Sequence, residues 1–392
     1  MRKTVRQNKQ DCTGCQACAL VCPRHAISMA EDEEGFLYPR VDPSACVGCD
    51  LCEKNCPSGK KLFQNSPRAF GAKNRDDSER QSASSGGVFS VLADRTLEAG
   101  GVVFGAVFDE KLHVEHVGAI TREEIGPMKG SKYVQSDAGE GLLRAGQLIR
   151  QGMPVLFSGT PCQIAGLYAS LGLSRPDNLL TVDFICHGVP SPGVFRSYLQ
   201  KMEKESRQKI VSYSFRDKRL GWKNFSATAA FEDGSVHTGT QTEEPFLLGF
   251  LRNLYLRPSC HACGLRYGSH AADITLADLW GVGNLSGVLD DDKGLSLVFA
   301  NTERGQKALE ACENLDSFEI GDIQPLAKAN PSIFSPAAAN EKRAAFFRMF
   351  RRHGFREKDI RRLLFPGKAG RILSRLRRAP RALARRLARK PK

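Results

Sequence analysis

Two short cysteine runs near the start of the chain have spacings that suit metal-cluster chemistry. "CTGCQACALVCP" and "CVGCDLCEKNCP" both read C-x2-C-x2-C-x3-C-P. Three cysteines spaced by two residues wrap a loop around three corners of a cubane, and the fourth cysteine of each run ligates the other cluster. The runs therefore predict two [4Fe–4S] clusters that relay single electrons. One cluster takes Cys12, Cys15, Cys18 and Cys56, and the other takes Cys22, Cys46, Cys49 and Cys52.

Zinc is the alternative for these cysteines, because zinc ribbons also use paired C-x2-C motifs. Eight cysteines in two runs that each end in proline fit zinc poorly. Residues 1–66 are therefore interpreted as a 2[4Fe–4S] domain of the bacterial ferredoxin type.

Five cysteines lie outside this domain, and four of them could form a third metal site. Cys162 follows a predicted strand at the start of a helix, and Cys186 ends the next predicted strand. If the strands are parallel neighbours, both thiols emerge at the carboxyl edge of the sheet, where open α/β folds bind ligands. Cys260 and Cys263 in "RPSCHACG" would complete the site. Two alternatives stay open, namely core cysteines at 162 and 186 and zinc at the C-x2-C pair; Cys312 is predicted to be an ordinary buried thiol.

The segments around these residues alternate between strands and helices. Buried strands are predicted at 102–108, 154–159 and 179–186, and helices at 84–101, 138–152, 160–172 and 191–207. Ser84 or Ser85 is the expected N-cap of the first helix. This alternation predicts an α/β fold, α+β overall, with a mixed and partly parallel sheet. The stretches 210–218 and 225–238 read as antiparallel.

The charge of the chain is concentrated at its C-terminal end. The net charge is +14, but the segment from Lys342 onward carries twenty Lys and Arg against two acids, which leaves −4 on the rest. The N-terminal residues have no apolar stretch after their positive charges, and no run of eighteen apolar residues occurs. These features predict a cytoplasmic protein, in which thirteen cysteines favour metal ligation over disulfides.

The basic tail has three interpretations. Its leucines and isoleucine lie near helical spacing with arginines between them, and Pro380 interrupts the pattern. A helix of this kind would lie on the inner face of a membrane, as a peripheral contact. A nucleic-acid arm is disfavoured, since the last 27 residues contain no aromatic side chain for stacking. A disordered solubilising tail is the third interpretation.

Several segments together resemble the coenzyme F420 hydrogenase/dehydrogenase beta-subunit family. They are "SSGGVFSVL", "KGSKYVQS", "LFSGTPCQIAGL", "FICHGVPSP", "FRDKRLGW" and "RPSCHACGLRYGSHAADITLADLWG". The resemblance covers roughly residues 1–335 and implies a flavoprotein with FAD and iron–sulfur clusters, some of whose members reduce a deazaflavin. It divides the body into the family's N-terminal, flavin-binding α/β part at 67–170 and the family's C-terminal part, with ligands of a third cluster, at 171–335. It also implies that Cys162, Cys186, Cys260 and Cys263 hold a third [4Fe–4S] cluster near the flavin; residues 336–392 are the helical basic tail.

The same resemblance favours two segments as flavin contacts. They contain Ser84, Ser85, Gly86, Gly87, Lys129, Lys132 and Tyr133. The start of a helix attracts phosphate, glycine allows close backbone approach, and the lysines and tyrosine offer charge and stacking. A simple cap and turn, or a solvated lysine loop, would explain the same residues. A G-x-G-x-x-G run after a strand is missing from the sequence, so a nicotinamide site gains no support.

His187 directly follows Cys186 and is the candidate catalytic residue, as a proton donor or as a hydrogen-bond donor to a sulfur. A structural histidine is the alternative.

The expected function is an oxidoreductase that is supplied by a ferredoxin-like donor protein. Electrons would pass through the clusters to FAD and on to a small organic acceptor. Many bacterial relatives with this ferredoxin-first layout lie among surface-polysaccharide genes, which suggests polysaccharide biosynthesis as the setting. Two alternatives are an electron-transfer subunit that feeds a partner enzyme, and a zinc-stabilised scaffold.

Overall fold

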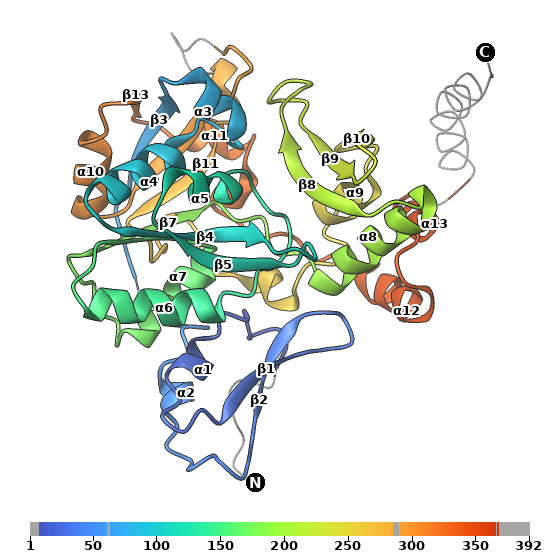
Figure 1. Ribbon diagram of the computed structural model, residues 1–392, viewed down its shortest axis with the longest axis horizontal. Helices are drawn as coiled ribbons and strands as arrows, with labels where there is room; N and C mark the ends of the chain where they lie inside the picture. The colour runs from blue at the N-terminus through green and yellow to red at the C-terminus, as the bar shows by residue number, and fades with distance from the viewer. Residues whose placement is uncertain (1–7, 61–62, 285–289, 366, 368–392) are drawn as a thin grey trace.

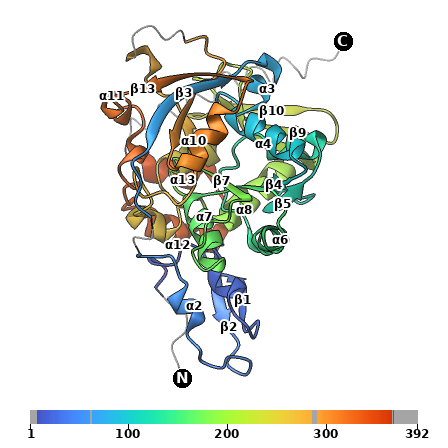
Figure 2. The same ribbon diagram turned by 90° about the vertical axis from the view of Figure 1, so that its left-hand side faces the viewer.

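The computed structural model describes residues 8–60, 63–284, 290–365 and 367, and places a small N-terminal module beneath a larger α/β body (Figures 1 and 2). The module consists of two short helices and an antiparallel hairpin. These are α1 (Ala17–Leu20), β1 (Ile27–Glu31), β2 (Leu37–Val41) and α2 (Leu51–Lys54). Each helix lies within one cysteine run and ends before the proline that closes it, because proline cannot continue a helix.

An eight-stranded sheet forms the centre of the body, in the order β13-β3-β12-β11-β7-β6-β4-β5. Four neighbouring strands run parallel, namely β11 (Ile274–Asp278), β7 (Leu179–Phe184), β6 (Val155–Ser158) and β4 (Val102–Phe108). Antiparallel strands extend the sheet on both sides, namely β3 (Arg68–Asn74), β5 (Val114–Ala119), β12 (Ser296–Ala300) and β13 (Leu315–Ile320). The predicted mixed, partly parallel α/β sheet is confirmed.

Helices cover both faces of this sheet because its strand residues alternate between the two faces. Val103, Leu156 and Val182 pack with α4 (Val88–Glu98) and α10 (Glu303–Glu310). Their strand neighbours Phe104 and Phe157 pack on the other face with α6 (Gly139–Arg150) and α7 (Pro161–Ser170). Short segments such as α3 (Asp77–Ser82), α5 (Arg122–Ile125) and α11 (Gln324–Ala327) complete the body. Each large aliphatic side chain buried here contributes roughly 1.5–3 kcal/mol.

A second, antiparallel sheet lies beside the first, on the right in Figure 1. It contains β8 (Ile210–Asp217), β9 (Ser226–Phe231) and β10 (Val236–Thr240). The helices α8 (Pro192–Ser206), α9 (Pro245–Leu251), α12 (Arg343–His353) and α13 (Glu357–Leu364) pack around it through an aromatic core. Phe195, Phe215 and Phe246 meet there with ring centroids 5.1 to 5.8 Å apart. The antiparallel reading of 210–218 and 225–238 is therefore right.

The start of one predicted helix is wrong. The helix predicted at 84–101 begins at Val88, and its N-cap is Gly87 in the left-handed region at φ 81° instead of Ser84 or Ser85. The two serines lie in a preceding loop, where Ser85 Oγ donates to the Leu295 carbonyl. A serine side chain that is hydrogen-bonded to another segment is not available to cap the helix. In contrast, Pro161 occupies the first position of α7 after Thr160, as predicted.

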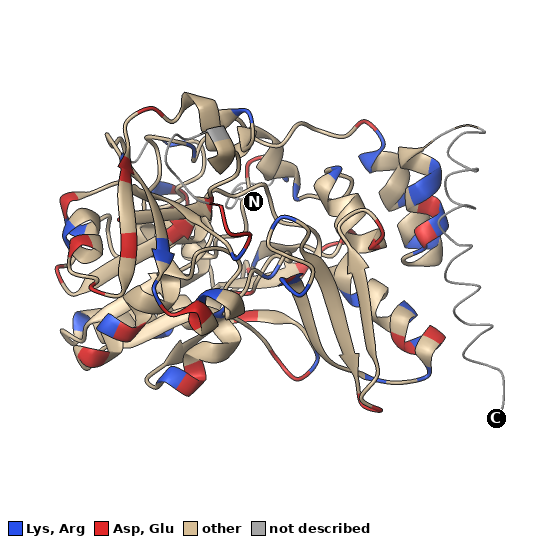
Figure 3. Cartoon of the chain, turned by 90° about the horizontal axis from the view of Figure 1, so that it is seen from above, with Lys and Arg blue, Asp and Glu red and all other residues tan. Residues whose placement is uncertain are grey.

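The described part of the tail is helical and basic. Lys and Arg residues gather on α12 and α13, near the end of the described chain (Figure 3). The leucine and arginine pattern read as a membrane-surface helix lies in 368–392, outside the described residues. Among the residues that are described, no helix is both long and apolar enough to span a membrane.

Candidate redox site

The first cysteine set lies in the interior of the N-terminal module. Cys15, Cys18 and Cys56 are buried, and Cys12 is half-buried. Burial, and then the charges of nearby thiols that include Cys56, raise the pKa of Cys15 to about 12. Burial also raises the pKa of Cys18, and the thiols of Cys15, Cys12 and Cys56 add to the effect. The four thiols assigned to one cluster from spacing therefore lie together.

The second set lies at the exposed end of the module. Cys22, Cys46, Cys49 and Cys52 all line one hollow. Cys49 is exposed, and Val47 beside it is 62% exposed. The thiols of Cys22 and Cys49 act on Cys52, whose pKa is raised mainly by burial. A second protein could therefore approach this set, whereas the first set is enclosed.

A third set forms at the carboxyl edge of the main sheet. Cys162 lies in the first turn of α7, directly after β6, and Cys186 lies two residues beyond β7. Cys260 and Cys263 come from the short 3-10 segment Pro258–Ala262 and its C-cap. Burial raises the pKa of Cys186 well above its usual range, and the charges of Cys260, Cys162 and Cys263 raise it further. All four half-buried thiols thus converge, as the parallel-strand argument predicts.

The donors of this third set suit an iron–sulfur cluster. Four soft sulfur ligands converge, the Val189 N–H donates to Cys260 Sγ at 3.4 Å, and Thr160 Oγ1 lies 3.2 Å from Cys162 Sγ. Hydrogen bonds to sulfur are among the contacts that tune such clusters. Among the described residues, no three His, Cys, Asp or Glu side chains meet closely enough to hold a single ion. A cubane requires no such meeting point, because each thiolate binds its own corner.

The first and third sets are neighbours. A Cβ placed on Gly166 of α7 would lie 3.0 Å from Cys15 Cβ and 3.3 Å from Cys15 Sγ. The charge of Cys162 also acts on the Cys15 thiol. The absence of a side chain at Gly166 therefore lets the cysteine loop of the module pack directly on the helix that carries Cys162.

The predicted flavin contacts also gather in one place. Ser131 N donates to Ser84 Oγ at 2.6 Å, which joins the 84–87 loop to the 129–133 segment. Gly86 N donates to Ser296 Oγ, and a Cβ on Gly86 would lie 2.4 Å from the Ala72 carbonyl oxygen. Gly86 is therefore needed for close packing, and its N–H is already engaged.

The two predicted lysines of this region have different surroundings. Lys129 forms an ion pair with Glu79 at 2.5 Å. Lys132 pairs with no acid in the described part of the chain and donates from Nζ to the carbonyls of Pro127 and Lys129. Burial lowers the pKa of Lys132 to about 7. Lys132 is therefore the better candidate for a ligand contact, because a bound anionic group would favour the charged form of its side chain.

Arg216 on β8 connects the segments of this region. It donates to the Ser84 carbonyl at 2.9 Å, to Asp278 Oδ1 at 3.0 Å and to Tyr133 Oη at 3.3 Å. Its Nε is buried and has no hydrogen-bond partner among the described residues. Trp222 also donates to Asp278 Oδ1, at 2.9 Å. An unsatisfied buried guanidinium donor beside a tyrosine ring fits a planar, anionic group such as a flavin.

His187 links this region to the third set. Its Nε2 lies 2.6 Å from Asn253 Oδ1, and burial lowers its pKa. Its ring meets Phe250 edge-on at 5.2 Å, and Phe250 packs on Tyr133 at 5.0 Å. A continuous line of packed rings thus leads from the residue after Cys186 to the predicted flavin contacts. The partner on Nε2 gives His187 a structural role, and its catalytic role stays a prediction.

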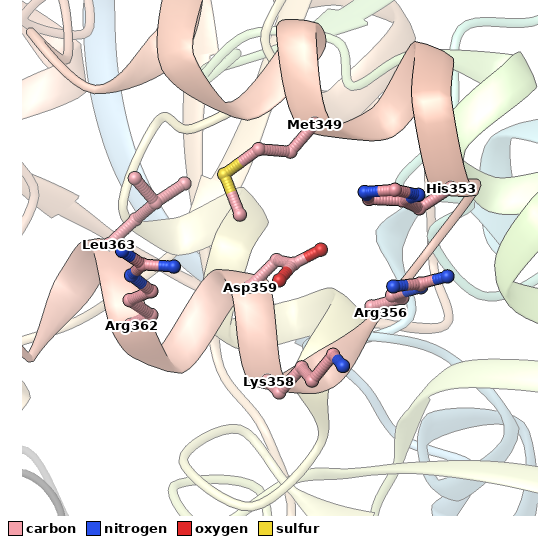
Figure 4. A pocket seen from close by; sticks show the side chains of 7 residues that line it. All are labelled: Met349, His353, Arg356, Lys358, Asp359, Arg362 and Leu363. Carbon is pink, nitrogen blue, oxygen red and sulfur yellow. The ribbon is translucent and has the colours of Figure 1, made fainter.

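A separate hollow of about 560 Å³ lies between α12 and α13. Met349 and Asp359 extend toward each other across it, and Arg356 and Arg362 lie at its sides (Figure 4). No cysteine lines it, and none of the predicted flavin contacts does. It is therefore separate from the cysteine sets.

Two parts of the chain match known families. Residues 152–325 match the C terminus of the coenzyme F420 hydrogenase/dehydrogenase beta subunit, and residues 11–60 match a 4Fe-4S dicluster domain. The chain therefore contains a domain of the coenzyme F420 hydrogenase/dehydrogenase beta-subunit family behind a domain for two [4Fe–4S] clusters. It is an iron–sulfur electron-transfer protein related to those beta subunits.

Individual relatives match this chain over very different lengths. The F subunit of the F(420)H(2) dehydrogenase of Methanosarcina mazei is 23% identical over 329 residues, which cover 79% of this chain and 84% of the relative. The VorC subunit of the ketoisovalerate oxidoreductase of Methanothermobacter marburgensis is 33% identical over 52 residues, 13% of this chain and 66% of the relative. A chain of the F420-reducing [NiFe] hydrogenase complex from Methanosarcina barkeri, studied by xenon derivatization, is 22% identical. The match covers 70% of this chain and 90% of that chain, with a TM-score of 0.46.

Sequence reasoning missed the cations that hold the site together. The cations Arg216 and Lys218, together with the neutral Trp222, lie in "FRDKRLGW", a segment that contributed only to the family resemblance. Lys218 Nζ donates to three carbonyls, including that of Ser85 at 2.6 Å. Arg257 lies in "RPSCHACG" and reaches the first cysteine set. The mixture of cations and aromatics in these segments was the available signal.

Proposed function

We propose that this chain is an iron–sulfur flavoprotein oxidoreductase with three [4Fe–4S] clusters and FAD. The observation that carries the proposal is the contact of Cys15 with Gly166 of α7, one helical turn after Cys162. This contact joins the first set to the third, and Cys18 of the first set packs with Cys22 and Cys52 of the second, so the three sets are neighbours in series from exposed Cys49 to the sheet edge. The order supports a relay that begins at a docked one-electron carrier protein.

The residues of the sheet edge support a flavin at the end of this relay. Lys132 and the free Nε of Arg216 would face its anionic parts, and Tyr133 would pack on its ring. Bound FAD would collect two single electrons and pass them as a pair, with protons from water, to an organic acceptor. The proposed setting in surface-polysaccharide biosynthesis rests on the sequence resemblance.

The test begins with the composition of anaerobically purified, reconstituted protein. We expect about twelve irons, matching sulfide, no zinc and one flavin per chain. A reduced ferredoxin should then bleach the bound flavin. About eight irons with one zinc and no flavin would overturn the proposal and favour the zinc-stabilised scaffold. Unbleached flavin in protein with twelve irons would overturn the relay.

A second candidate is an electron-transfer subunit that feeds a separate enzyme. The name of the Methanosarcina mazei relative, which is one subunit of a dehydrogenase, favours it. The two proposals differ in what the isolated chain can do. Catalytic reduction of a small acceptor by the purified chain supports the first, whereas bleaching without turnover until a partner is added supports the second.

A further inference from the structure

Arg257 is the residue whose surroundings the proposed relay leaves unexplained. Its backbone begins the loop of the third cysteine set, where Cys260 N donates to the Arg257 carbonyl at 3.0 Å. Its side chain runs the other way, into the N-terminal module, and is fully buried. One residue thus belongs to the third set by its backbone and to the first by its guanidinium.

The guanidinium is held firmly against the first cysteine loop. Nε donates to the Cys12 carbonyl at 2.7 Å, and one terminal nitrogen donates to the Leu37 carbonyl at 3.0 Å and lies 3.5 Å from Cys12 Sγ. The other terminal nitrogen donates to Gln135 Oε1 at 2.9 Å. The Tyr38 ring lies 4.1 Å from the guanidinium carbon.

The module leaves room for this side chain. A Cβ on Gly14, between Cys12 and Cys15, would lie 2.8 Å from one terminal nitrogen of Arg257. Gly14 also has a φ of +71°, which disfavours other residues. The cysteine loop is therefore shaped to admit the arginine.

The positive charge of Arg257 has no protein counter-charge among the described residues. Its acceptors there are neutral carbonyls, an amide and a thiol. Two acids of the nearby hairpin bind other cations, since Asp32 pairs with Lys9 and Glu34 with Arg343. A buried charge without a counter-charge is destabilising, so the site favours an anionic group of another kind beside it.

Iron–sulfur clusters are such groups. A cubane held by four thiolates has a net negative charge, and the charge grows when the cluster is reduced. Arg257 contacts Cys12 of the first set. Its backbone carbonyl accepts from Cys260 N of the third set at 3.0 Å, and Cys15 of the first set packs against Gly166 of α7, the helix that carries Cys162. Both clusters would therefore feel the same cation.

We propose that Arg257 is the shared counter-cation of the first and third clusters and raises the reduction potential of both. This inference rests on the proposed third cluster. A positive charge stabilises the reduced, more negative form, so a shared cation keeps the two potentials high together. The electron can then cross from the module to the sheet edge without a large energy step. Arg257 is a positioning residue in this relay and does not touch the acceptor.

The test is a mediated redox titration of the reconstituted full-length chain, followed by EPR. Substitution of one ligand in each set, Cys18→Ser, Cys52→Ser and Cys260→Ser, assigns the signals. Arg257→Met removes the charge and keeps much of the volume. We expect the reduced-to-oxidised ratio of the first and third clusters, at a fixed potential, to fall about tenfold each. This is about 59 mV for a one-electron couple. The second cluster should not move.

Arg266 provides the matched control. It is also buried, but it donates to the carbonyls of Cys186 and Ser332 at 2.8 and 3.1 Å, both away from the module. Arg266→Gln should therefore shift the third cluster and leave the first unchanged. A shift of the first cluster by Arg266→Gln as large as that by Arg257→Met would overturn the assignment.

The remaining outcomes separate this inference from the proposed function. About eight irons in the parent protein would refute the third cluster and the inference with it. Twelve irons with unshifted potentials in Arg257→Met would refute only the role of Arg257. If Arg257→Met does not load iron, Arg257→Lys decides, because lysine keeps the charge without the forked geometry. Its two potentials should stay within about a threefold ratio of the parent, and a tenfold fall would overturn the inference.

Discussion

The N-terminal module and the sheet edge both gather cysteines, but they do so in different ways. The module takes eight cysteines from two contiguous runs, and each run wraps its own loop. The edge takes four from three segments, which β6, β7 and the loop after Leu256 bring together. The module therefore depends on local spacing, and the edge depends on a correctly folded sheet. Substitutions should affect the two regions differently.

The largest expected effect comes from removing an edge ligand. Cys260→Ser should reduce the iron content from about twelve to about eight per chain and abolish flavin bleaching by reduced ferredoxin, because the link between module and flavin is lost. Iron analysis and stopped-flow absorbance measure both effects.

Two controls accompany this substitution. Cys312→Ser should keep all the iron, since that thiol is buried and donates to the Ala308 carbonyl. Cys49→Ser should lose the second cluster only, without destabilising the body. Full iron content in Cys260→Ser would show that this thiol binds no cluster.

The next largest effect is on the stability of the α/β body, at the sheet edge where Asp278 pairs with Arg216. Asp278→Ala would leave Arg216 buried without its carboxylate, and breaking a buried pair costs about 3–5 kcal/mol. The free energy of unfolding of the body, measured in urea, should fall by about this amount, while the EPR signals of the module clusters persist before the transition. Asp278→Asn keeps one oxygen acceptor and should cost less. A loss below about 1 kcal/mol in Asp278→Ala would contradict the buried-pair interpretation.

A smaller effect is expected on flavin affinity and its pH dependence. Burial lowers the pKa of Lys132 to about 7, so the side chain is cationic below that pH and neutral above it. An anionic flavin gains attraction only from the cation, so FAD affinity should fall as pH rises through about 7. In Lys132→Met, affinity at pH 6 should be about tenfold weaker, and the pH dependence flatter.

Fluorescence titration of the apoprotein at pH 6 and pH 8.5 measures this difference. Lys111→Met, at a turn in the described chain, provides a lysine control outside the predicted flavin contacts. An unchanged pH slope in Lys132→Met would exclude Lys132 as the source.

The smallest effect is predicted for an ion pair at the far side of the main sheet. Arg68 and Glu319 lie 2.9 Å apart and have side-chain exposures of 44% and 54%. Exposed pairs contribute about 0–1 kcal/mol because solvent and salt screen them. Arg68→Ala should therefore change the free energy of unfolding by less than about 1 kcal/mol. A larger loss would mean that the ion pair between Arg68 of β3 and Glu319 of β13 stabilises the fold more than its exposure predicts.

The sequence predicted the parts of this molecule that depend on local pattern. The strands 102–108 and 179–184 were predicted because apolar residues run together there, although the second was extended two residues too far, and their parallel order then placed Cys162 and Cys186 at one edge. Prolines and glycines also marked several helix ends. The grouping of the third set needed only the rule that parallel strands end at the same side of a sheet.

The remainder depends on contacts between distant segments. The strand β3 pairs with β12 and β13, more than 200 residues later, and the period of one strand carries no information on its partner. Ser84 and Ser85 were misplaced as N-caps because their partners, Ser131 N and the Leu295 carbonyl, lie far along the chain. The bonds of Arg257 to the first cysteine loop were invisible for the same reason.

The bond between Arg257 and Cys12 joins residues 245 positions apart and therefore has a consequence for the order of events during synthesis. At typical elongation rates of about 5–20 residues per second, the cysteine loop leaves the ribosome roughly ten to fifty seconds before the arginine that covers it. During that interval Cys12, Cys15 and Cys18 lack the core that later buries them. Iron delivery therefore has a natural time window, and a pause in translation between the module and Arg257 would lengthen it.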